Sequence, residues 1–124
     1  MVPIILVAIG GAVGVTARFL LSEWVAQLHG STHVPWPTLV VNVLGCLVAG
    51  CLIGLGGRYG FLTSELRLLL FAGLLGGFTT FSAFGIETVM LLKQGAWETA
   101  VAYVASSVIL GCGGVALGMW WMSE

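Results

Sequence analysis

Charged residues are rare in this chain, and they leave four long stretches that carry no charge. These stretches are Met1–Ala17, Trp24–Gly57, Leu68–Ile86 and Thr99–Ser123. Each can hold a helix of roughly 20 residues, the length that crosses the hydrocarbon core of a bilayer. The pattern predicts four transmembrane helices, which run from about Pro3 to Ser22, from Thr38 to about Leu55, from Glu65 to Lys93 and from Trp97 to Trp121.

Amphipathic aromatic residues fall at the predicted helix ends. Such rings prefer the headgroup region of a bilayer, so they support these positions for the ends. They are Trp24, Trp36, Tyr59, Trp97, Trp120 and Trp121.

The composition agrees with an integral membrane protein. Of 124 residues, 59% are hydrophobic and only 7% are charged, and the mean hydropathy is +1.10, far from that of a soluble domain. No Lys or Arg precedes Arg18, so the first span lacks the basic start of a secretory signal and is expected to be retained. We expect one membrane domain over residues 1–124. The formal net charge of -1 offers no basic surface for nucleic acid.

Glycine pairs at i, i+4 recur in all four spans. Small residues at this spacing let helix backbones approach closely in lipid, so they predict tight helix packing. The pairs are Gly10/Gly14, Gly50/Gly54, Gly73/Gly77 and Gly114/Gly118.

The cysteines and histidines give no clear metal site. Cys46, Cys51 and Cys112 lack CxxC spacing and are interpreted as small packing residues. His29 and His33 could form half a metal site if their segment were helical. We favour a polar interfacial loop, because no carboxylate or cysteine lies near them in the sequence.

The third span contains an unusual run, GLLGGFTTFSAFG, from Gly73 to Gly85. Glycine loosens a helix, and clustered hydroxyls offer its backbone other hydrogen-bond partners. We therefore expect a break at Gly76–Thr79. Because freed backbone groups in a bilayer need partners, the carbonyls of a break on a two-fold axis could hold a cation.

The other polar residues inside the spans are mostly neutral. They are Thr38, Asn42, Thr79, Thr80, Ser82, Tyr103, Ser106 and Ser107, and Glu87 is the one ionisable group well within a span. Taken singly, each could simply bond a neighbouring helix. Taken together with Phe81 and Phe84, whose ring edges are electropositive, they would form a lining of weak donors. Such a lining suits a small anion, because weak donors replace water and still release the ion.

The basic residues do not favour one orientation in the membrane. Arg18 and Lys93 lie on one side, and Arg58 and Arg67 lie on the other. The positive-inside rule therefore predicts neither orientation. This balance suggests an antiparallel pair made from two copies of the chain.

The run GLLGGFTTFSAF closely resembles the characteristic motif of the Fluc (CrcB) family of fluoride channels. Three further matches accompany it: Gly14-x-x-x-Arg18, Thr38-x-x-x-Asn42 and Tyr103-x-x-x-Ser107. The resemblance covers the whole chain. It implies a dual-topology antiparallel homodimer in the bacterial plasma membrane, which exports fluoride from the cytoplasm by passive electrodiffusion.

The resemblance also implies roles for single residues. The backbone carbonyls of Gly76 and Thr79 would bind a structural Na⁺ at the two-fold axis. Phe81 and Phe84 would present ring edges to fluoride, and Asn42 would supply an amide donor. The polar track and its surroundings would consist of Thr38, Ser82, Glu87, Tyr103 and Ser107. Arg18 would have a structural or vestibule role, whereas Gly111 and Val115 stand where some relatives carry hydroxyls.

Two other classes of protein share some of these features with a channel. Small multidrug-resistance transporters are also short, four-helical and antiparallel, but they resemble one another in a deep Glu on the first helix, which this chain lacks. A non-conducting assembly subunit would leave the Phe and hydroxyl pattern without a purpose. An enzyme is not expected, because no nucleophile with a base partner is recognisable.

Overall fold

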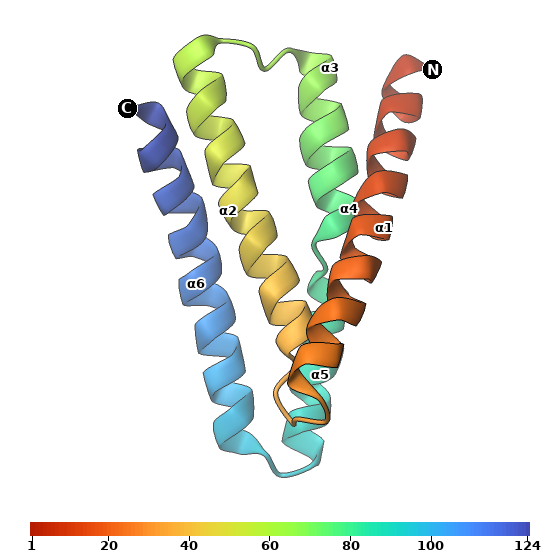
Figure 1. The fold of residues 1–124 in the computed structure, drawn as a ribbon, viewed down its shortest axis with the longest axis vertical. Helices are drawn as coiled ribbons and strands as arrows, with labels where there is room; N and C mark the ends of the chain where they lie inside the picture. Colours follow the sequence, from red (N-terminus) through yellow and green to blue (C-terminus); the bar gives the residue numbers. More distant parts are fainter.

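The computed structural model describes residues 1–124 and is entirely helical (Figure 1). The chain forms four long apolar rods that alternate in direction, so both termini lie at the same end. Its elements are α1 (Val2–His29), α2 (Trp36–Tyr59), α3 (Ser64–Arg67), the π-helix η1 (Leu68–Leu75), α4 (Gly76–Phe78), α5 (Phe81–Lys93) and α6 (Trp97–Ser123). The elements α3, η1, α4 and α5 together make the third rod, Ser64–Lys93. The four predicted spans are thereby confirmed.

The first helix is longer than the sequence predicted. It was expected to end near Ser22, but it continues to His29 and stops at Gly30, whose φ is 60°. No Gly or Pro interrupts the residues between Ser22 and Gly30, so the helix continues beyond its most apolar part. The expected span ended near Ser22, which placed Arg18 at the end of the first helix; in the structure Arg18 lies well inside α1, and this corrects the expectation.

The other helix ends lie close to their predicted positions. The second helix begins at Trp36, just before Thr38. It ends at Tyr59, about one turn beyond the predicted Leu55, and is followed by Gly60 in the left-handed conformation (φ 65°, ψ 18°) that glycine tolerates. In the third rod, the Thr63 side chain caps α3 by accepting a hydrogen bond from Leu66 N at 3.2 Å. These local signals were present in the sequence.

Two pairs of helices account for most of the packing. In one pair, α2 lies along α6, and in the other, α1 lies along η1 and α4 (Figure 1). A Cβ added at Gly118 of α6 would lie 2.7 Å from Leu47 O of α2, and one added at Gly77 would lie 2.7 Å from Gly11 O of α1. Only glycine permits these approaches, so the predicted packing role of the small-residue pairs is confirmed at these contacts.

The third rod is interrupted, as predicted, but the break lies at Thr79–Thr80. Gly76, Gly77 and Phe78 are helical, whereas Thr79 (φ -84°, ψ 159°) and Thr80 (φ -148°, ψ 118°) are extended. The expected break at Gly76–Thr79 is therefore shifted toward the C-terminus. The reason is that Gly77 is needed for close packing on α1, while Thr80 N finds another hydrogen-bond partner in Asn42.

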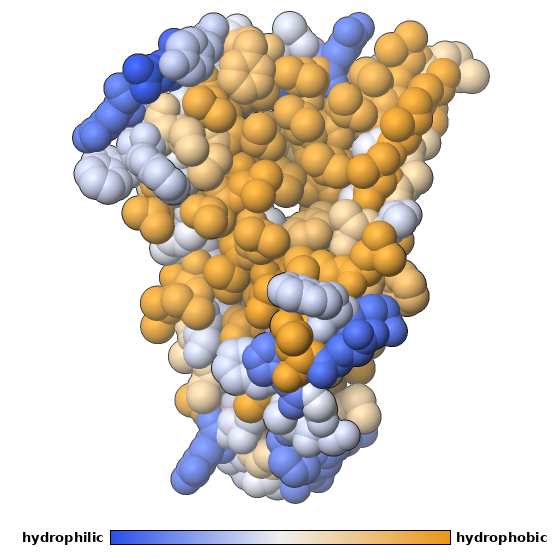
Figure 2. Space-filling model, viewed as in Figure 1, coloured by the Kyte–Doolittle hydropathy of each residue, from blue (hydrophilic) through white to orange (hydrophobic).

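The surface of the single chain is mainly apolar. Hydrophobic residues cover most of the face seen in Figure 2, and hydrophilic residues gather toward its two ends. Only 17 of the 124 residues are buried, which is few for a protein with this much apolar surface. A bilayer, or a second chain within one, is the environment in which such a surface is stable.

Candidate functional site

The break is held open by Asn42 of α2. The side-chain Oδ1 of Asn42 accepts from Thr80 N at 2.8 Å, and its Nδ2 donates to Thr80 O at 2.9 Å. The amide thus satisfies both backbone groups of one residue in the broken segment, as a neighbouring strand would. One of the two N–H groups on Nδ2 is left for another acceptor. The structure therefore adds a structural role to the one predicted for Asn42, and its contact with an anion stays a prediction.

The interruption deprives the carbonyls of residues 76–79 of their helical donors. In a continuous helix Thr80 N would donate to Gly76 O, but it donates to Asn42 instead. Ala83 N would donate to Thr79 O, but it donates to Thr80 Oγ1 at 3.2 Å. The two carbonyls predicted to hold Na⁺ are thus among those that lose their helical donors. Neutral carbonyl oxygens are suitable ligands for a hard cation, so the residues present fit this ion.

Three aromatic rings stand in a row on α5 and α6. The ring centroids of Phe81 and Phe84 are 5.6 Å apart with an interplanar angle of 36°, and those of Phe84 and Tyr103 are 5.3 Å apart at 46°. Tilted pairs at these distances turn ring edges toward a neighbour. Phe81 is 83% exposed in the single chain, whereas Tyr103 is only 2% exposed. The row therefore runs from the surface into the protein.

Glu87 joins three helices near the end of this row. Its Oε1 accepts from Thr38 Oγ1 of α2 at 2.6 Å, and its Oε2 accepts from Tyr103 Oη of α6 at 2.7 Å. The predicted track residues Thr38, Glu87 and Tyr103 are thus brought together. Each hydroxyl has a single proton and directs it at Glu87, so these two groups fix α5 between α2 and α6 and do not point free donors at an anion.

A recess of about 270 Å³ lies beside the break. It is lined by Asn42, Cys46, Thr79, Thr80, Phe81, Phe84, Ser107 and Val108. Ser82 does not line it but lies at its edge, where its Oγ is 3.3 Å from Thr80 Oγ1. The recess therefore collects four of the eight residues predicted for the fluoride pathway, and no charged side chain lines it. The four are Asn42, Phe81, Phe84 and Ser107.

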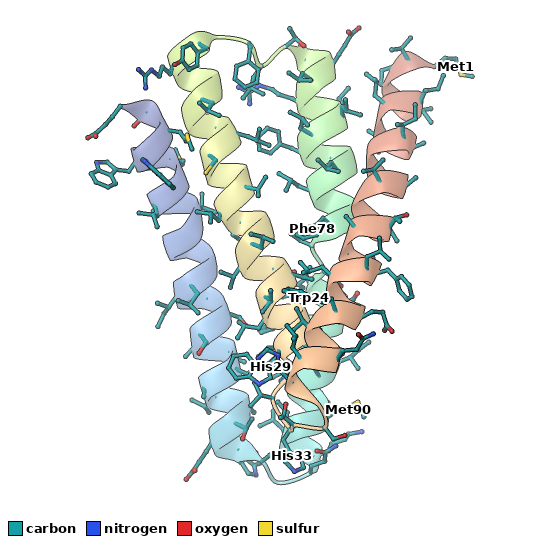
Figure 3. All side chains as sticks on the ribbon, viewed as in Figure 1. Met1, Trp24, His29, His33, Phe78 and Met90 are labelled. Atoms are coloured by element: carbon teal, nitrogen blue, oxygen red, sulfur yellow. The ribbon has the colours of Figure 1, made fainter.

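The histidines and cysteines form no metal site. His29 is the last residue of α1 and not part of a loop as expected, and its ring stacks on Trp36 with centroids 5.1 Å apart. His29 and His33 lie at the end of the molecule opposite the termini (Figure 3). No group of three or more His, Cys, Asp or Glu side chains is placed to hold a metal ion. Cys46, Cys51 and Cys112 are free thiols.

Sequence reasoning missed the residues that support the break from α2. Phe78 lies beside the break (Figure 3), and a Cβ added at Gly45 would lie 3.2 Å from Phe78 Cδ1. The methyl group of Thr79 contacts Gly45 even more closely. Gly45 therefore lets the broken segment approach α2 near Asn42. The sequence did offer a signal for this contact, because Gly45 is a small residue on the second span between Asn42 and the Gly50/Gly54 pair.

Fold and site together define a multi-pass α-helical membrane protein with an interrupted helix beside a neutral, aromatic-lined recess. This class includes channels and transporters. Residues 5–119 match the family model described as CrcB-like protein, Camphor Resistance (CrcB). The chain belongs to this family, which confirms the resemblance seen in the sequence.

Named relatives cover nearly the whole chain. The fluoride-specific ion channel FluC of Methylobacillus flagellatus is 50% identical over 111 residues, which are 90% of this chain and 87% of that protein. The FluC of Phocaeicola vulgatus is 42% identical over 100% of both chains. The FluC of Rhizobium johnstonii is 44% identical over 96% of this chain and 94% of its own. These relatives are bacterial ion channels, which confirms that the chain is a multi-pass protein of the bacterial plasma membrane and not an enzyme.

Proposed function

We propose that two copies of this chain form a fluoride channel that exports F⁻ from the cytoplasm by passive electrodiffusion. The observation that carries the proposal is the pair of Phe81 and Phe84 rings in a recess that also holds Asn42 and the Ser107 hydroxyl. The relatives named above are fluoride-specific ion channels, which supports the choice of ion.

The chemistry of the recess favours a small, strongly hydrated anion. Fluoride loses its water only where several donors replace it, and here these are the second N–H of Asn42, the Ser107 hydroxyl and the electropositive ring edges. None carries a full charge, so the ion is bound weakly enough to leave again. No Asp, Glu, Lys, Arg or His side chain lines the recess, so no proton or cation exchange is needed for each ion that passes.

An antiparallel partner would complete the pathway. Phe81 projects from the single chain with 83% of its surface exposed, although its partner Phe84 and the recess lie behind it. A second copy in the opposite orientation would cover this ring and turn the open recess into an enclosed path. The two-against-two distribution of basic residues supports insertion in both orientations.

A Na⁺ ion on the two-fold axis would be held by the carbonyls of Gly76 and Thr79. Both carbonyls lack their helical N–H donors because Asn42 and Thr80 Oγ1 take the corresponding amides. When bound, Na⁺ would supply positive charge that offsets the clustered carbonyl dipoles of two broken helices. Its contribution would be structural, because it would join the two broken helices at the two-fold axis, whereas Asn42 and the Thr80 cap hold the break within each chain.

Fluoride efflux from proteoliposomes tests the function directly. Liposomes loaded with KF and containing the purified protein should release fluoride to a fluoride electrode when valinomycin relieves the potential, and liposomes loaded with KCl should retain chloride. Equal rates for both ions would contradict fluoride selectivity. Efflux of an organic cation driven by a proton gradient, without fluoride release, would favour the multidrug-transporter alternative.

The Na⁺ site has a separate test. Protein purified and reconstituted with N-methylglucamine in place of Na⁺ should lose fluoride efflux, and added NaCl should restore it. Unchanged efflux without Na⁺ would contradict the site and leave the channel proposal intact.

A further inference from the structure

The polar side chains that line the recess differ between α2 and α6. From α2 they are Asn42 and Cys46, four residues apart, and from α6 there is only Ser107, because the position four residues further is Gly111. Each step of four residues advances about 6 Å along a helix. One turn beyond Asn42 and Ser107, the Cys46 thiol therefore faces Gly111, which has no side chain.

The thiol borders the space that a side chain at position 111 would use. A Cβ added at Gly111 would have one neighbour within 4 Å, Cys46 Sγ at 3.5 Å. The space above Gly111 is thus open except for the sulfur of Cys46. Cys46 is half-buried and lines the same recess as Asn42 and Ser107.

The recess ends one turn further along both helices. A Cβ added at Gly50 would lie 2.9 Å from Val115 Cα, and the carbonyl oxygen of Val115 is closer still, so α2 and α6 touch backbone to backbone there. Nothing can pass between the two helices at that level. Cys46 is therefore the last polar side chain of this recess before the helices close.

We propose that Cys46 lines the anion pathway of this chain and that its S–H group is the donor at the level where Gly111 offers none. A thiol is a weak hydrogen-bond donor and a polarisable group, so it can contact a passing anion without holding it. This inference rests on the proposed channel function. It gives Cys46 a role beyond packing, while Cys51, half-buried one turn further along α2, keeps the packing role.

Substitutions at positions 46 and 111 test whether a hydrogen-bond donor on α6 can replace the Cys46 thiol on α2. Cys46→Ala should lower the initial fluoride efflux rate by about tenfold, as expected for one lost contact of about 1.4 kcal/mol in the pathway. The double variant Cys46→Ala/Gly111→Ser places a hydroxyl in the vacated space from the opposite helix and should restore efflux. Cys51→Ala is the matched control and should conduct like the wild type. Wild-type efflux in Cys46→Ala would overturn the proposal.

Thiol labelling separates this inference from the channel proposal. Methyl methanethiosulfonate, a small neutral reagent, should label Cys46 in liposomes faster than Cys51, as followed by intact-protein mass in single-cysteine variants. Labelling of Cys46 should block fluoride efflux in proportion to its extent. A Cys46 that stays unlabelled while fluoride flows, or is labelled without loss of flux, would overturn the proposal. Rapid labelling in a protein that releases no fluoride would contradict only the channel function.

Discussion

Asn42 and Thr80 are joined by two hydrogen bonds of 2.8 and 2.9 Å, through which one side-chain amide satisfies both backbone groups of a residue near the middle of the third rod. The pair fixes the interrupted rod to α2. It also leaves one Asn42 N–H free beside the recess. The same side chain is therefore in a position to hold the break and to face the ion.

Replacing Asn42 with Asp should abolish fluoride efflux. Aspartate still accepts from Thr80 N, but it loses the donor to Thr80 O and faces the anion with a negative charge. The loss of one bond to a buried carbonyl should also lower the free energy of unfolding by about 1–3 kcal/mol. Asn42→Ala, which carries no charge, is the control for the charge effect. Efflux at the wild-type rate in Asn42→Asp would mean that Asn42 only packs helices.

Replacing Phe81 or Phe84 with Ile should reduce fluoride efflux by more than about tenfold while the protein stays folded. Ile keeps apolar bulk but lacks the electropositive ring edge. Efflux per reconstituted protein and elution from a sizing column are the measurements. Phe19→Ile, at a ring that is 62% exposed on α1, is the control and should conduct normally. Normal flux in both test variants would refute the ring-edge mechanism.

Glu87 and Tyr103 should be energetically coupled. Glu87→Gln removes the charge that strengthens two hydrogen bonds, and Tyr103→Phe removes one of the donors. Thermal unfolding in detergent should show a loss of about 1–3 kcal/mol for each single variant and a smaller loss than their sum for the double variant. The same cycle between Glu98→Gln and Tyr103→Phe should be additive, because no hydrogen bond links those side chains. Additivity in the Glu87 cycle would contradict the three-helix connection.

The glycines of α6 should differ sharply in their tolerance of alanine. A Cβ at Gly118 would lie 2.7 Å from Cys51 N and Leu47 O, both backbone atoms that move only with the helix, whereas a Cβ at Gly113 meets nothing within 4 Å. Gly118→Ala should lower stability by about 1–3 kcal/mol. Gly113→Ala should leave it unchanged or raise it by about 0.4–1 kcal/mol. Thermal unfolding in detergent measures the stability of each variant. Equal effects of Gly118→Ala and Gly113→Ala on stability would contradict the observed contact between α2 and α6.

The chain should insert into the membrane in both orientations. A reporter fused after Glu124 should be found on both sides of the membrane. Two or three Lys added between Arg58 and Arg67 should bias the chain one way, and Lys added near Ser31 should bias it the other. Each biased variant alone should lose fluoride efflux, and co-expression of the two should restore it. Full conduction by a single-sided variant would refute the antiparallel dimer.

The sequence by itself determined the four spans and the presence of a break. Uncharged stretches of bilayer length and the small-residue pairs act locally or through helix periodicity, so they can be recognised without the fold. The family motif brought Asn42, Phe81 and Phe84 to attention. These features depend on neighbours along the chain.

Tertiary structure decided where the break lies and what each polar group does. The break lies at Thr79–Thr80 and not at the predicted Gly76–Thr79, because Gly77 packs closely on α1 as part of a helix. In addition Asn42, far away in sequence, supplies the hydrogen bonds that an extended Thr80 requires. The hydroxyls of Thr38 and Tyr103 donate to Glu87, because the packing of three helices brings these side chains together. Pairings between distant segments depend on which helix faces meet, and the local sequence does not encode them.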